Sequence, residues 1–173
     1  QPCDAVWRGS GGTAIHVSRD GGQTWRDLGA GTPPPDFVAA GQGGTIAGIH
    51  AGVVELADGR LLALGRGDAI RGQVGPGHNI EEHMPMSLSP DMGRTWTYHP
   101  SPFPPIGGGQ RLALMRLRQG PILIASFTGP VDHDEGMVFT DPNGRTFRGY
   151  GLFAALSYDE GASWPVRRLL TPG

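Results

Sequence analysis

Three aspartates lie in the setting that most resembles a chemical site, each surrounded by hydroxyl side chains, glycine and tryptophan. Asp20 lies in SRDGGQTW (18–25), Asp91 in SPDMGRTW (89–96) and Asp159 in SYDEGASW (157–164). All three segments fit the pattern S-x-D-x-G-x-[ST]-W, and a carboxylate in such surroundings could be catalytic. A catalytic group is not needed once in every interval of about 70 residues, whereas a turn is. Short polar side chains bond to the backbone in turns, so we predict that these aspartates are structural.

The segments that carry these motifs are short apolar runs, which predict an all-β fold. Thirty glycines and sixteen prolines are spread between the runs and indicate many turns. Asp-Gly or Gly-Pro between two apolar runs is typical of a hairpin. The predicted hairpins join 53–56 to 61–64 and 112–117 to 122–127, and the runs 84–88 and 152–156 lead directly into the second and third motifs. The run 112–117 is apolar enough to predict a strand that is buried on both faces.

The order of these runs repeats, and the repeat predicts a β-propeller. Each period reads strand, turn, strand, long loop, strand, motif and short strand, which describes a four-stranded antiparallel blade. We expect residues 1–173 to form part of one propeller domain, with a partial blade at 4–30 and blades at 46–100 and 109–170. Segments 31–36 and 100–109, rich in proline and glycine, would connect them. The segment TDPNGRTF (140–147) imitates the motif with Pro142 in place of the aspartate and is interpreted as a loop turn.

The motif and the blade text GVVELADGRLLALGR resemble the Asp-box (BNR repeat) propellers of the sialidase, or neuraminidase, family. The resemblance covers essentially the whole chain and implies a six-bladed propeller. It also implies that Trp25, Trp96 and Trp164 bury their rings between sheets. The implied activity is exo-α-sialidase hydrolysis of sialic acid or a related acidic sugar on glycoconjugates. A non-catalytic Asp-box propeller that binds glycan or protein, and a glycosidase for a different sugar, remain alternatives.

Strand order places the candidate site at the end of the blades opposite the Asp-boxes, where first strands start and second strands end. We call this end the mouth. Alignment of the hairpin glycines puts His50 and Arg111 at matched first-strand starts, while Arg66 ends a second strand and Arg8 ends that of the partial blade. Arginine suits a carboxylate ligand, because its planar fork binds both oxygens.

The sialidase resemblance assigns these residues roles. The family grips the substrate carboxylate with three arginines and uses a tyrosine nucleophile assisted by glutamate, with an aspartate as acid/base. Arg66 falls on the family's second arginine, and His50 stands in place of the glutamate. Phe127 stands where the third arginine is expected, and Arg111 could replace that arginine. The first arginine, the acid/base aspartate and the nucleophile are expected outside this segment, and Tyr150 is the alternative nucleophile within it.

The loops at the mouth add further polar side chains. The cluster from His78 to His83 has the composition of a metal site but lacks the histidine spacing of zinc proteases, so it is interpreted as a loop. We predict neither a metal nor another cofactor. The loop residues on this side are Asp68, Arg71, His78, Glu81, Glu82, Asp132, His133, Asp134 and Glu135.

Charge and composition limit the partners of the chain. Fourteen basic and sixteen acidic side chains nearly cancel, so no nucleic-acid partner is predicted. No apolar run reaches the roughly 20 residues of a membrane span. The single cysteine, Cys3, excludes an internal disulfide and identifies no compartment, while the resemblance favours a secreted or periplasmic location. Two and a half blades expose their flanks, so we expect the partners to be a carbohydrate and the rest of a propeller or other copies of the chain.

Overall fold

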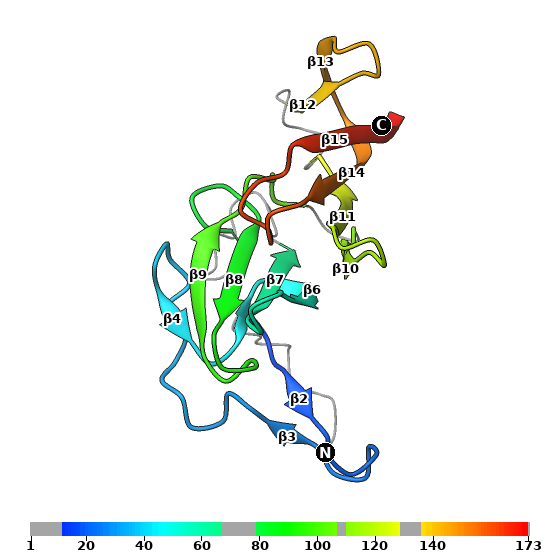
Figure 1. Cartoon of the computed structure of the whole chain (residues 1–173). Coiled ribbons are helices and arrows are strands. Elements are labelled where there is room, and N and C mark those ends of the chain that lie inside the picture. The colour runs from blue at the N-terminus through cyan, green and yellow to red at the C-terminus, as the bar shows by residue number, and fades with distance from the viewer. Residues whose placement is uncertain (1–11, 67–78, 107–109, 129–135, 173) are drawn as a thin grey trace.

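The computed structural model describes residues 12–66, 79–106, 110–128 and 136–172. Every regular secondary-structure element in these ranges is a β-strand (Figure 1). The all-β prediction is therefore confirmed. The strands are β1 (Gly12–Thr13), β2 (His16–Val17), β3 (Arg26–Asp27), β4 (Gln42–Gly43), β5 (Ile46–Ala47), β6 (Ile49–Glu55), β7 (Leu61–Arg66), β8 (Pro85–Ser89), β9 (Trp96–Pro100), β10 (Ala113–Arg116), β11 (Ile122–Phe127), β12 (Met137–Thr140), β13 (Thr146–Gly149), β14 (Gly151–Ser157) and β15 (Val166–Pro172).

The middle sheet contains the four antiparallel strands predicted between residues 46 and 100, together with one extra strand. Its order is β4-β9-β8-β7-β6, and β6 and β7 form the predicted hairpin around Asp58-Gly59. The extra strand, β4, pairs with β9 and comes from the segment that follows the proline-rich stretch 33–35. The Tyr98 amide donates to the Gly41 carbonyl at 3.0 Å, so the pairing continues beyond β4. This segment therefore widens the sheet as well as connecting it to its neighbour.

The second complete sheet has the order β10-β11-β14-β15, and all three pairings are antiparallel. A separate hairpin, β12–β13, is inserted between β11 and β14. The segment 140–147, which was interpreted as a loop turn, lies mostly in this hairpin, because Thr140 pairs with Thr146 and Phe139 with Phe147. Asp141 forms the turn by accepting from the amides of Asn143 at 2.9 Å and Arg145 at 2.8 Å.

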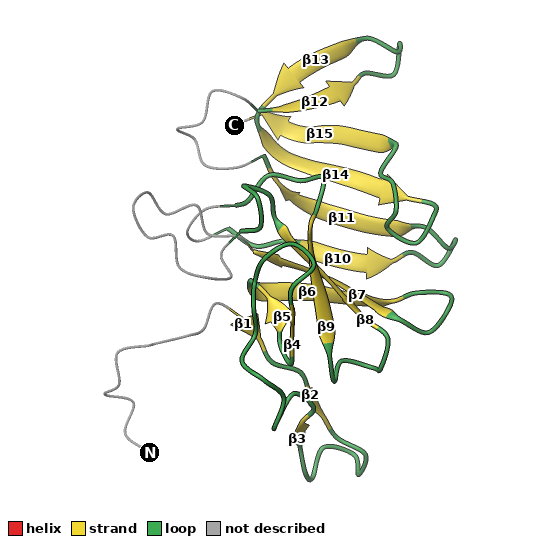
Figure 2. Cartoon of the chain, turned by 90° about the vertical axis from the view of Figure 1, so that its left-hand side faces the viewer, coloured by secondary structure: helices red, strands yellow, loops and turns green. Residues whose placement is uncertain are grey.

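The first unit, which consists of β2 and β3 with the first Asp-box between them, is smaller than the two complete sheets. The sheets follow one another in chain order (Figure 1). Strands β2 and β3 pair around the first Asp-box, and β1 pairs with β5 next to the middle sheet. The β6–β7, β10–β11 and β14–β15 turns emerge on the same side in Figure 2. The described strands form five open sheets, and no closed ring of sheets is present among them.

Burial along the strands corrects one prediction. The strand buried on both faces is β7, whose six residues are all buried, with Leu62 and Leu64 in one core cluster and Leu61 and Ala63 in the other. The predicted strand at 112–117 is buried on one face only, because Met115 is 49% exposed. Strand β10 packs against β6, and no other described sheet covers its opposite face.

Two apolar clusters hold the sheets together, and each buries one Asp-box tryptophan. Trp164 belongs to the cluster between the two complete sheets, where it meets the Phe103 ring edge-on at a centroid distance of 5.2 Å. Trp96 belongs to the cluster between the middle sheet and the first unit. Trp25 was expected to be buried too but is 61% exposed, because no described sheet packs over it. Burial is thus confirmed for two of the three tryptophans.

Candidate functional site

The three Asp-boxes form nearly identical hydrogen-bond networks within their own turns. In the second box, Asp91 Oδ1 accepts from the Thr95 amide at 2.8 Å and from Ser89 Oγ at 2.9 Å, and Asp91 Oδ2 accepts from Thr95 Oγ1 at 2.7 Å. The Gly93 amide donates to Ser89 Oγ at 2.8 Å. The glycine has a φ of 93°, a conformation that glycine adopts at little cost. The first and third boxes repeat these contacts around Asp20 and Asp159.

These contacts stabilise the ionised form of each aspartate. Hydrogen bonds from the Thr24 hydroxyl and amide, with that from Ser18, lower the pKa of Asp20 to about 2. The pKa of Asp159 is lowered in the same way by Ser163 and Ser157. For Asp91, desolvation is the largest single influence and raises the pKa, but the donors around it together outweigh desolvation and lower the pKa. A carboxylate with a lowered pKa is a poor proton donor at neutral pH, so this chemistry suits a structural role.

The strand register places the Asp-boxes at the end of the sheet opposite the mouth. Ser89, the first residue of the second box, pairs with Leu61 at the start of β7, whereas Arg66 ends β7 and pairs with Ile49. The third box follows the same rule, because Ser157 pairs with Ile122 at the start of β11. Asp91 and Asp159 are therefore separated from Arg66 by the length of a strand.

At the mouth, the structure brings together two of the predicted arginines. Arg66 Nη1 donates to the Gln110 carbonyl oxygen at 3.3 Å, and Arg111 Nη1 donates to the same oxygen at 2.8 Å. The two guanidinium groups thus lie side by side although they come from different sheets. Arg66 is only 6% exposed, whereas Arg111 is exposed to solvent.

The packing of the two innermost strands explains this meeting. Arg66, which pairs with Ile49 at the start of β6, contacts Gln110, and at the far ends Arg116 donates to the Glu55 carbonyl at 2.9 Å. Between them, Gly52 approaches Leu114 so closely that a Cβ on the glycine would lie 2.6 Å from Leu114 Cβ. These contacts occur in the same order along both strands, so β6 and β10 run side by side in one direction.

His50 follows Ile49, the residue that pairs with Arg66, and its backbone is irregular. The pairing of β6 with β7 shifts register between Ile49 and Gly52, and His50 has a φ of 52° in the left-handed region. Bulges redirect side chains and are frequent beside binding sites. A positive φ at a residue other than glycine costs about 1–3 kcal/mol and marks a position that the surrounding structure holds in place. The His50 side chain is exposed.

Several predicted residues fall elsewhere or outside the described ranges. Phe127 ends β11 at the mouth, and Tyr150 precedes β14 at the same end. Glu81 and Glu82 form a tight turn closed by hydrogen bonds between Ile80 and His83, and both have positive φ. The predicted residues that lie outside the described ranges are Arg8, Asp68, Arg71, His78, Asp132, His133, Asp134 and Glu135.

Sequence reasoning missed a clamp that joins the two complete sheets at the Asp-box end. Glu160 of the third box accepts from Arg116 Nη2 at 2.6 Å and from the Ala57 amide at 2.7 Å. The hydrogen bonds from Arg116 and from Ala57 lower the pKa of Glu160. The sequence signal is the variable fourth position of the box, which is glycine, methionine and glutamate in the three copies. The missed acceptor at the mouth, the Gln110 carbonyl, has no sequence signal because every residue carries a carbonyl.

Metal-binding clusters and membrane helices are both absent from the described ranges. They contain no group of three or more histidine, cysteine or acidic side chains placed to hold a metal ion. They also contain no helix that is long and apolar enough to cross a membrane.

The chain was compared with protein-family models and with curated proteins. Neither comparison found a match. Functional inference therefore depends on the residues and their geometry.

Proposed function

We propose that this chain is part of a sialidase-like β-propeller that binds an acidic sugar at its mouth through Arg66 and Arg111. The observation that carries the proposal is the shared contact of both guanidinium groups with the Gln110 carbonyl. Two guanidinium groups that lie side by side can both donate hydrogen bonds to the same anion. A carboxylate is the anion that the resemblance to sialidases implies, and guanidinium forks bind carboxylates through paired hydrogen bonds.

The supporting features are the blade topology and the position of the Asp-boxes. Each complete sheet contains four neighbouring antiparallel strands, with its Asp-box between the third and fourth of them in chain order. The Asp-box carboxylates are engaged by their own turns, which leaves the mouth as the proposed ligand end. Hydrolysis of a terminal sialic acid is the proposed reaction, with the acid/base and nucleophile supplied from outside the described residues.

A non-catalytic propeller is the second candidate, and two substitutions favour it. His50 occupies the position that the resemblance assigns to a glutamate, and Phe127 the position assigned to the third arginine. An imidazole cannot replace a carboxylate as the partner of a tyrosine nucleophile without changing the charge of the site. Such a protein would keep recognition of the acidic sugar and lose its hydrolysis.

Isothermal titration with N-acetylneuraminic acid, and with its 2,3-unsaturated analogue, tests the proposal. We expect Arg66→Lys to weaken binding about tenfold or more, because an ammonium group cannot reproduce the planar fork. Lysine is chosen for the buried position so that the charge is retained. Arg118→Lys, in the β10–β11 turn at the Asp-box end, is the matched control and should bind as the parent does.

Two results decide between the acidic-sugar site and its absence, and between the hydrolase and the non-catalytic candidate. Unchanged binding in both Arg66→Lys and Arg111→Ala would overturn the carboxylate clamp. Binding of the acid without release of a fluorogenic aglycone from its 2-glycoside, measured on the complete propeller with its remaining blades, would favour the non-catalytic candidate over the hydrolase.

A further inference from the structure

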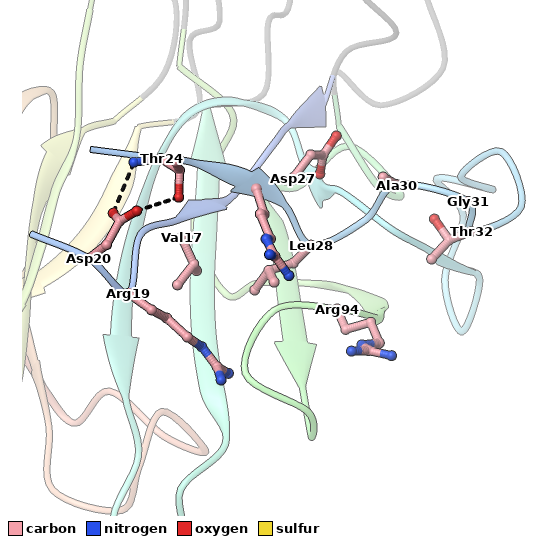
Figure 3. Close-up of a pocket in the computed structure, with 11 residues that line it drawn as sticks. Val17, Arg19, Asp20, Thr24, Asp27, Leu28, Ala30, Gly31, Thr32 and Arg94 are labelled. Atoms are coloured by element: carbon pink, nitrogen blue, oxygen red, sulfur yellow. Dashed lines mark hydrogen bonds between the residues drawn. The ribbon is translucent and has the colours of Figure 1, made fainter. Parts of the chain in front are cut away.

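A pocket of about 750 Å³ opens at the Asp-box end of the molecule, remote from the mouth (Figure 3). Its walls come from the β2–β3 hairpin, from the segment after β3 that reaches Thr32, and from the β8–β9 turn through Arg94. The pocket therefore lies where the first Asp-box unit meets the middle sheet. Its volume is within the range of about 300–1,000 Å³ that is usual for small-ligand sites.

Three arginines line this pocket, two from the β2–β3 hairpin and one from the β8–β9 turn. Arg19 is the second residue of the first Asp-box, Arg26 begins β3, and Arg94 is the sixth residue of the second Asp-box. The box positions that hold Arg19 and Arg94 are variable in the motif, so the turns do not need arginine there. Folding brings Arg94 to the hairpin that carries Arg19 and Arg26, so three permanent positive charges line one hollow.

Two carboxylates also line the pocket, but each is engaged locally. Both Asp20 oxygens accept from Thr24, and Oδ1 also accepts from Ser18. Asp27 Oδ1 accepts from the Gly29 amide at 2.9 Å. Within the described ranges no ion pair joins either aspartate to any of the three arginines. The arginines thus remain available to a ligand of opposite charge.

The junction between the two complete sheets provides an internal comparison. There the arginine at the Asp-box end, Arg116, is bound by the Glu160 carboxylate and by the carbonyls of Glu55 and Gly120. In that junction the protein itself supplies the carboxylate that pairs with the arginine, and the pair forms the clamp. The first junction collects three arginines and, among the described residues, supplies no such carboxylate.

We propose that this pocket binds a small molecule that carries a sulfate or phosphate group. A tetrahedral oxyanion presents several oxygens, and guanidinium groups that line the same hollow can each donate charged hydrogen bonds to it. A bare anion fills only a small part of the pocket, so the rest of the volume suits the organic portion of an ester. The site is separate from the acidic-sugar site at the mouth and does not depend on it.

Isothermal titration of the full chain with glucose 6-sulfate and glucose 6-phosphate, at constant ionic strength, tests the proposal. We expect saturable binding with one site per chain. Arg19→Gln and Arg94→Gln should each weaken it about tenfold, as loss of a charged hydrogen bond predicts. Arg118→Gln, exposed in the β10–β11 turn, is the matched control. Circular dichroism and the melting temperature verify that each variant is folded.

Parallel titrations with inorganic sulfate, inorganic phosphate and glucose distinguish the sources of the anion. Tighter binding of an ester than of the free ion supports a small-molecule ligand, and no binding of glucose shows that the anion is required. Equal affinity for the free ion and the ester would overturn recognition of the organic portion. The anion site itself is refuted if the triple variant R19Q/R26Q/R94Q binds both esters as tightly as the parent. Arg66→Lys should bind the esters as the parent does. Refutation of the acidic-sugar site at the mouth can therefore be told apart from refutation of the ester site in the pocket.

Discussion

Replacement of Asp91 by asparagine tests whether the Asp-boxes are structural. The carboxylate accepts three hydrogen bonds, from Ser89 Oγ and from the amide and hydroxyl of Thr95. Asparagine keeps one acceptor oxygen and places an NH₂ group where the second oxygen was, so the contact with the Thr95 hydroxyl must reverse and the charge is lost. Hydrogen bonds to charged groups contribute about 1.5–3 kcal/mol when buried. Because Asp91 is largely exposed, we expect a loss of only about 1–2 kcal/mol.

Thermal unfolding followed by circular dichroism measures this loss. A change of 1 kcal/mol corresponds to about 2–4 °C in a domain of this size, so Asp91→Asn should lower the melting temperature by roughly 2–8 °C. Ligand affinity of the folded protein should not change. Asp20→Asn is the matched control, because it removes the same hydrogen bonds from the peripheral β2–β3 hairpin. That hairpin can open locally, so its variant should melt closer to the parent.

The pH dependence of stability follows from the same carboxylates. The pKa of Asp20, Asp91 and Asp159 is lower in the folded protein than the value of about 3.9 in an unfolded chain. The folded state therefore binds fewer protons, and the stabilisation is complete above about pH 5. It is lost as the pH falls through the folded values, which for Asp20 means about 2. Asp91→Asn should reduce the slope of melting temperature against pH below about pH 4.

The reasoning is refuted by a variant that keeps the parent's melting temperature and pH slope but no longer binds ligand. That outcome would mean that Asp91 acts on a ligand rather than on its own turn. Equal losses of stability in Asp91→Asn and Asp20→Asn would instead show that the first hairpin unfolds together with the rest of the chain.

Three further expectations concern packing and can be measured by urea denaturation. Trp96→Ala should cost about 3–5 kcal/mol because the ring is 1% exposed, whereas Trp25→Ala, at 61% exposed, should cost less than about 1 kcal/mol; equal costs would contradict the core described here. Glu160→Gln should cost about 0.5–1 kcal/mol, since the ion pair of the clamp is about one-third exposed, and the loss should shrink in high salt. Gly52→Ala should cost about 1–3 kcal/mol by forcing β6 away from Leu114, and a neutral effect would show that the strands can separate freely.

Local patterns in the sequence were sufficient for most of the β-structure. The Asp58-Gly59 and Gly120-Pro121 pairs mark hairpins because their backbone conformations are set by the residues themselves. Gly59 and Gly120 both have positive φ in the structure. The Asp-box networks were predictable for the same reason, since every donor and acceptor lies within the eight-residue motif.

Burial and added strands were not predictable from the same patterns. Periodicity shows that a face is apolar but not whether another sheet covers it, so the burial of Trp25 and of the strand at 112–117 was predicted wrongly. The strand β4 lies outside the predicted blades, and the turn predicted at 140–147 gave no sign that the residues on both sides of it pair as the β12–β13 hairpin. Their pairing depends on long-range contacts, such as that of Gly43 with Trp96.

For the candidate site, too, some features were predictable from the sequence and others depended on the tertiary structure. The sequence alone placed His50 and Arg66 at strand ends and Arg111 just ahead of a strand, because a hairpin returns the chain by a countable number of residues. Only the packing of β10 against β6 decided that the Arg66 and Arg111 guanidinium groups share one carbonyl, since that contact joins two sheets. The pocket with Arg19, Arg26 and Arg94 could not be predicted from the sequence for the same physical reason: Arg94 joins the two arginines of the β2–β3 hairpin only after that hairpin has packed against the middle sheet.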